Sequence, residues 1–205
     1  MQSFLPALPR GTSLQQPTFI EEMMAAGRGV LGLFVGNRQA GSFFDFSQRG
    51  LVTSFIALLL VTALNVSLPT IMGVEGESIT RSLVIFALLF VPQLGFTAIA
   101  LRQLGRLDGF VPYLVADNWA TFFLTLISSA VIASGLAGEM TIIVLGITVI
   151  IVEVNIARLI VTLSPMQIAI FLIARVVGFS IGLLMVGVIF PLPPELIETL
   201  SNPPA

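Results

Sequence analysis

The chain has 205 residues, of which 56% are hydrophobic and only 10% are charged, and its formal net charge is −2. A typical soluble domain is about 25% charged, and so few charges cannot cover the apolar surface of a water-soluble fold of this length. Cysteine, histidine and lysine are all absent, which excludes disulfides, Cys or His metal sites and Ser-His-Asp catalysis. We therefore expect an all-α integral membrane protein without a metal or cofactor, and neither an enzyme nor a nucleic-acid-binding protein.

Residues 1–49 are expected to form a cytoplasmic N-terminal segment with an amphipathic helix on the membrane surface. Thr18 and Glu21 have the spacing of a helix-capping box, and apolar residues recur at helical spacing from Phe19 to Phe34. The segment is predicted to anchor the chain at the lipid surface, with docking to a partner protein as the alternative. The residues predicted to make this interfacial or partner contact are Phe19, Met23, Phe34, Phe43, Phe44 and Phe46.

Residues 50–190 are predicted to form a transmembrane domain of about five helices. Each apolar stretch is about long enough to cross a ~30 Å hydrocarbon core at 1.5 Å per residue. Between the last two stretches the only break is Ser164-Pro165, which leaves a single bent hairpin as an alternative to two helices and a tight turn. The predicted spans are Leu51–Ile71, Ser82–Leu101, Val111–Ala133, Met140–Leu163 and Met166–Phe190, and residues 191–205 follow as a proline-rich tail.

Four charged residues, Asp117, Glu153, Arg158 and Arg175, fall inside the last three predicted spans. One charge at the centre of a membrane costs about 2.5–3.5 kcal/mol on insertion scales, so it needs a partner or a purpose. Counted from the turn at Ser164-Pro165, Glu153 matches Arg175 in depth, and Asp117 matches Arg158. We predict two ion pairs that fix the order of these helices. An ion path is the first alternative, and snorkelling of Asp117 and Arg158 to the interface is the second.

Two glycines of the last span, Gly178 and Gly182, have the small-residue spacing that lets two membrane helices approach closely. We predict that they form a helix-packing contact.

The arginines are distributed unevenly between the two sides of the predicted spans. Cytoplasmic loops carry an excess of Arg and Lys, so the N-terminus is predicted to lie in the cytoplasm of a bacterium and the C-terminus outside its inner membrane. The arginines on the predicted cytoplasmic side are Arg10, Arg28, Arg38, Arg49, Arg102 and Arg106.

The aromatic segment Phe43-Phe44-Asp45-Phe46-Ser47-x-x-Gly50 precedes the first of five closely spaced spans. This layout resembles the Yip1-like membrane proteins and small bacterial membrane proteins of unknown function. The resemblance implies a non-enzymatic membrane scaffold or trafficking component. We therefore expect a non-catalytic accessory or scaffold subunit that contacts membrane lipid and other integral membrane subunits of the inner membrane. The alternative is a small transporter or channel subunit whose buried charges line the path.

Overall fold

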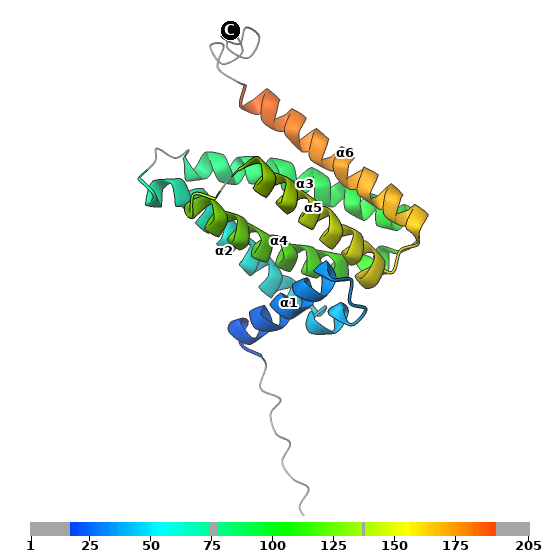
Figure 1. Ribbon diagram of the computed structural model, residues 1–205. Coiled ribbons are helices and arrows are strands. Elements are labelled where there is room, and N and C mark those ends of the chain that lie inside the picture. The colour runs from blue at the N-terminus through cyan, green and yellow to red at the C-terminus, as the bar shows by residue number, and fades with distance from the viewer. Residues whose placement is uncertain (1–16, 74–77, 137, 192–205) are drawn as a thin grey trace, which may run out of the picture.

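The computed structural model describes residues 17–73, 78–136 and 138–191, and all regular structure in these ranges is helical (Figure 1). The predicted proline-rich tail beyond residue 191 and Arg10 lie outside the described residues. The elements in chain order are α1 (Phe19–Phe34), η1 (Ala40–Phe43), α2 (Gln48–Ile71), α3 (Ile79–Gln103), η2 (Leu107–Gly109), α4 (Phe110–Ala133), α5 (Glu139–Asn155), η3 (Ile156–Ile160) and α6 (Pro165–Ile189).

Five helical stretches among the described residues are long and apolar enough to cross a membrane. They are α2, α3, the stretch Leu107–Ala133, the stretch Glu139–Ile160 and α6. This confirms the predicted number of spans and the predicted all-helical fold.

Short polar residues begin the helices where the apolar runs start. The Ser47 hydroxyl accepts a hydrogen bond from the Gly50 amide at the start of α2, which satisfies one of the free amides of a first helical turn. At α6, Ser164 and Gln167 form a capping box and Pro165 occupies the first turn. The break predicted at Ser164-Pro165 is therefore the boundary between two separate helices.

The segment before this boundary is irregular. After α5 the chain widens into the single π-helical turn η3, and Thr162 then adopts a left-handed conformation with φ of 58°. A β-branched residue rarely adopts this conformation. Arg106 stabilises it, because its guanidinium donates to the Thr162 carbonyl oxygen at 2.9 Å and to the Thr162 hydroxyl at 2.7 Å.

The spans pack as two pairs, α2 with α4 and α3 with α6, and α5 lies beside α4 and α1 (Figure 1). Between α2 and α4, the buried Asn118 amide donates to the Ser54 hydroxyl at 3.0 Å. At the α3–α6 crossing, a Cβ added to Gly178 would lie 2.7 Å from the Gln93 Cα, and one added to Gly182 would lie 2.7 Å from the Leu88 carbonyl oxygen. Both glycines therefore lie where two backbones meet, and α6 packs on α3 more closely than on its chain neighbour α5.

Helix α1 packs against α4 and α5 with one face buried. The capping box predicted at Thr18 and Glu21 is present at its start. At its end, the Asn155 side chain of α5 donates to the Leu33 carbonyl oxygen at 2.8 Å. Near its start, the Phe19 ring lies 6.0 Å from that of the fully buried Trp119. The hydrophobic core is therefore continuous across the predicted boundary between residues 49 and 50.

Candidate functional site

Three charged side chains from three different spans meet inside the bundle. Arg175 of α6 forms an ion pair with Glu153 of α5, and its Nη1 also donates to Asp117 Oδ1 of α4 at 3.5 Å. The exposed fractions of the Asp117, Glu153 and Arg175 side chains are 12%, 15% and 12%. We call these three residues the charge cluster.

An aromatic ring completes one side of the charge cluster. The guanidinium carbon of Arg175 lies 5.3 Å from the centre of the Tyr113 ring, within the range of a cation–π interaction. Tyr113 is only 1% exposed. The sequence prediction did not include Tyr113. Its spacing of four residues from Asp117 was the available signal, since residues at i and i+4 share one helix face.

The predicted partner of Asp117 was Arg158, and here the structure differs. Asp117 bonds to Arg175, whereas Arg158 is exposed in the π-helical turn and forms no ion pair with a described residue. The depth argument located each residue only along the membrane normal. It could not anticipate that a π turn redirects the side chains of residues 156–160. The predicted Glu153–Arg175 pair is therefore present, whereas the predicted Asp117–Arg158 pair is absent, because Asp117 joins the first pair in one three-residue cluster.

Three cavities border the charge cluster from different sides. A cavity of about 400 Å³ between α5 and α6 is bordered by Glu153 and Arg175. A second, of about 190 Å³, lies between α4 and α5 and is bordered by Asp117 and Glu153. A third, of about 140 Å³, lies among α2, α3, α4 and α6 and is bordered by Asp117 and Arg175. The cluster thus separates spaces that are each large enough for water.

The two cavities beside α5 exist because α5 is sparsely covered. Val152 is the one buried residue of α5 itself, whereas α4 contributes a long run of buried residues. Gln93 of α3, which the sequence prediction did not assign to the site, borders the first and third cavities. Among the described residues no group of three or more acidic side chains could hold a metal ion.

Most of the six side chains that were predicted to contact lipid or a partner are instead packed toward the bundle. Phe44 is 8% exposed, and its ring lies against Gly29, where an added Cβ would be 2.6 Å from the ring. A tight fit of this kind leaves Phe44 inaccessible to a partner. Phe34 is the most exposed of the set at 45%. The half-buried members are Phe19, Met23, Phe43 and Phe46.

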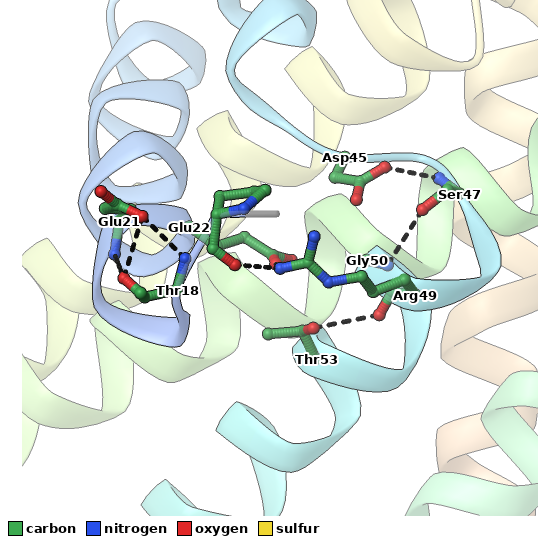
Figure 2. Close-up of polar contacts among 9 residues, drawn as sticks. Thr18, Glu21, Glu22, Asp45, Ser47, Arg49, Gly50 and Thr53 are labelled. Atoms are coloured by element: carbon green, nitrogen blue, oxygen red, sulfur yellow. Dashed lines mark hydrogen bonds and ion pairs between the residues drawn. The ribbon is translucent and has the colours of Figure 1, made fainter. Parts of the chain in front are cut away.

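A second polar contact joins α1 to α2 (Figure 2). Glu22 is 5% exposed, and its carboxylate lies 3.6 Å from the guanidinium of Arg49, which also donates to the Pro17 carbonyl oxygen. Burial, and after it the charge of Asp45, raises the pKa of Glu22 above its usual value. The sequence contains a sign of this burial, because Glu22 lies one helical turn before Ala26 and therefore on the same buried face of α1.

Comparison with known proteins gives no match: no family model matches the chain, and no similar curated protein or solved structure is found. The resemblance to the Yip1-like proteins therefore still rests on the layout of the spans.

Proposed function

We propose that this chain is a small transporter or channel subunit, and that the charge cluster binds the proton or monovalent cation that crosses the membrane. The observation that carries this proposal is the meeting of Asp117, Glu153 and Arg175 inside the bundle, with cavities on three sides.

The charges of the cluster do not balance. Two carboxylates face a single guanidinium, and Arg158, the residue expected to supply a second positive charge, is exposed elsewhere. A purely structural pair needs only one acid for each base, because uncompensated charge in a membrane interior is costly. The second carboxylate has a physical use if a proton or a monovalent cation binds there.

The surroundings of the cluster support passage. Asp117 and Glu153 both border the cavity between α4 and α5, and Glu153 also borders the larger cavity between α5 and α6. A group that reaches two spaces can receive a proton from one and release it to the other. Intramembrane ionisable residues that border water-accessible cavities commonly mark such pathways.

Proteoliposomes test this proposal directly. The purified chain is reconstituted with a pH-sensitive dye inside, and a potassium diffusion potential is imposed with valinomycin. A second series replaces the dye with an indicator for Na⁺, and a third, without valinomycin, follows K⁺ entry down an imposed K⁺ gradient. We expect cation entry faster than in protein-free liposomes, and Glu153→Gln should reduce it to the protein-free rate. Glu139→Gln is the matched control, since Glu139 is exposed at the start of the same stretch. Wild-type entry no faster than the protein-free rate for all three cations contradicts the proposal.

The accessory-subunit function remains a second candidate because of the outer face of α1. While one face of α1 packs on the bundle, an opposite stripe stays exposed, with Ile20 at 61% and Leu31 at 68%. This stripe would contact either lipid or another membrane subunit. A photo-crosslinking amino acid at position 31 distinguishes the two: a protein adduct favours the accessory role, whereas lipid adducts alone indicate a membrane-surface contact.

A further inference from the structure

The cavity between α5 and α6, at about 400 Å³ the largest of the three that border the charge cluster, differs in character from the other two. Its polar end is formed by Glu153, Arg175 and Gln93. Its walls are apolar and are formed by Val149, Ile150, Leu172, Val176 and Phe179. A space with apolar walls and a few convergent polar groups is typical of a small-molecule site.

The walls also extend to the outer surface of the bundle. Val149 is 43% exposed and Val176 is 64% exposed, so the residues that line the cavity also face the surroundings of the spans. In a bilayer those surroundings are acyl chains. An occupant could therefore enter laterally from the lipid, which favours a lipophilic molecule over a strongly hydrated one.

The charges at the polar end select the sign of the occupant. Glu153, shared with the neighbouring cavity, and Asp117 behind it are two carboxyl groups against the one guanidinium of Arg175, so the cluster is neutral while it holds one proton and carries one excess negative charge once that proton leaves. An anion would be repelled by the excess carboxylate, whereas a cation would neutralise it. Phe179 offers the face or edge of an aromatic ring along the same wall, a surface that also suits an organic cation.

We infer that this cavity binds a hydrophobic organic cation, with the positive charge of the cation beside Glu153. The inference rests on the proposed function and deepens it: one proton leaves the charge cluster when one monovalent cation binds, so the transport is an exchange of the two. The titratable and charged groups that face the exchange are Asp117 and Tyr113 from α4, Glu153 from α5 and Arg175 from α6, while α3 contributes the uncharged Gln93.

The binding test uses two probes of nearly the same size and opposite charge, tetraphenylphosphonium and tetraphenylborate. The full chain is placed in nanodiscs of uncharged lipid, and binding is measured by equilibrium dialysis against empty nanodiscs. We expect saturable binding of the phosphonium to one site per chain, with one proton released, and no borate binding above that of empty nanodiscs. Equal binding of both ions, or no excess phosphonium binding, overturns the inference.

Two further variants separate the cavity from the general stability of the fold. Val176→Phe fills the cavity without changing a charge and should abolish phosphonium binding. Ile173→Phe adds the same bulk on α6 at a residue that is 63% exposed and does not line the cavity, and it should bind as the wild type does. Fluorescence of the buried Trp119 checks that both variants are folded. If Val176→Phe is folded and still binds the probe at one site, the cavity is not the site.

The binding and flux measurements distinguish the two proposals. Cation entry into proteoliposomes without phosphonium binding leaves the transport function standing and overturns the hydrophobic-cation site. Phosphonium binding that requires Glu153, in a chain that admits neither protons nor metal cations into proteoliposomes and moves no protons when a phosphonium gradient is imposed, supports the site and overturns the transport function.

Discussion

Arg175 is the residue on which the polar interior of the bundle depends most, because both buried carboxylates contact it. A buried charge that loses its partner is costly, whereas replacement of all members of a buried ionic group by apolar residues can be close to neutral. The loss of stability caused by a mutation in the charge cluster should therefore depend on how many buried charges are left unpaired, and not on how many contacts are removed.

We expect Arg175→Leu to lower the free energy of unfolding by about 3–5 kcal/mol, because it leaves Asp117 and Glu153 buried without a cation. The triple change to Leu at all three positions should recover most of this loss, and the double change at Glu153 and Arg175 should fall between. Unfolding in mixed micelles titrated with SDS provides the measurement. Arg158→Leu is the control, and it should be nearly neutral because Arg158 is exposed and unpaired among the described residues. A triple variant less stable than Arg175→Leu would contradict this account.

The two neighbouring acids of α1 should respond to pH with opposite signs. Burial raises the pKa of Glu22 above 4.5, so its contribution to stability is complete below pH 4.5 and is lost as the pH rises through the raised pKa. Hydrogen bonds from Thr18 lower the pKa of Glu21, so its contribution is present above pH 4.5 and is lost as the pH falls through the lowered pKa. Glu22→Gln should remove the first dependence, and Glu21→Gln should remove the second.

Hydrogen exchange of the α1 amides, measured across this pH range, checks both expectations. Trp119 fluorescence gives an independent reading, since the Phe19 ring of α1 lies 6.0 Å from the indole. If Glu22→Gln leaves the pH dependence of α1 unchanged, the burial of the Glu22 carboxylate does not control how α1 packs.

At the scale of elements, the α3–α6 crossing brings two helix backbones so close that a single added methyl group tests the contact. We expect Gly178→Ala to destabilise the protein by about 1–3 kcal/mol, because the new methyl group would meet the backbone of Gln93. Gly187→Ala is the matched control, since an added Cβ there meets nothing within 4 Å, and it should be neutral or slightly stabilising. Thermal unfolding in detergent compares the two variants. Equal effects would show that the crossing is not tightly packed in the bilayer protein.

The sequence predicted where the helices begin and end better than it predicted which helices pack against each other. Hydropathy and length locate the five spans, and the local chemistry of Ser164 and Pro165 places the start of α6, because both signals are contained within a few consecutive residues. Which helices pair is a different question. The short connection between α5 and α6 suggested a close hairpin, but small residues let α6 approach α3 more closely.

Only part of the candidate site could be predicted, because the sequence gives the depth of a residue but not the direction of its side chain. Depth along the membrane normal can be read from sequence, and it placed Glu153 level with Arg175. The rotation of each helix about its axis cannot be read in this way when the apolar pattern covers the whole surface of the helix. Asp117 was therefore assigned to Arg158, and the side-chain directions around Tyr113 and Gln93 became apparent only from the packing.

At the scale of the whole molecule, the arginines outside the bundle interior are the basis on which we propose an orientation. The start of α2, the end of α3 and the end of the α5–η3 stretch lie at the end of the bundle that carries α1, and Arg49, Arg102, Arg106 and Arg158 lie there. Such an excess favours the cytoplasmic side, so we propose that the N-terminus is cytoplasmic and the C-terminus lies outside.

Topology reporters test this orientation. Alkaline phosphatase fused after the C-terminus, and in a separate fusion protein after Gly73, should be active because both points lie outside the cytoplasm. Green fluorescent protein fused at the N-terminus should fluoresce because it remains in the cytoplasm. A fluorescent fusion at the C-terminus combined with an inactive phosphatase fusion there would require an even number of spans or the opposite orientation.

The order in which the charge cluster is synthesised has a consequence for biogenesis. Asp117 and Glu153 belong to α4 and α5, whereas their shared partner Arg175 belongs to α6, which leaves the ribosome after both of them. Until α6 arrives, the nascent chain carries two carboxylates without their base, and the face of α3 that receives Gly178 and Gly182 is uncovered. A chain that stops before Pro165 would keep both defects permanently. Truncated chains should therefore be cleared by membrane proteases much faster than the complete chain, and co-expression of α6 as a separate peptide should protect them.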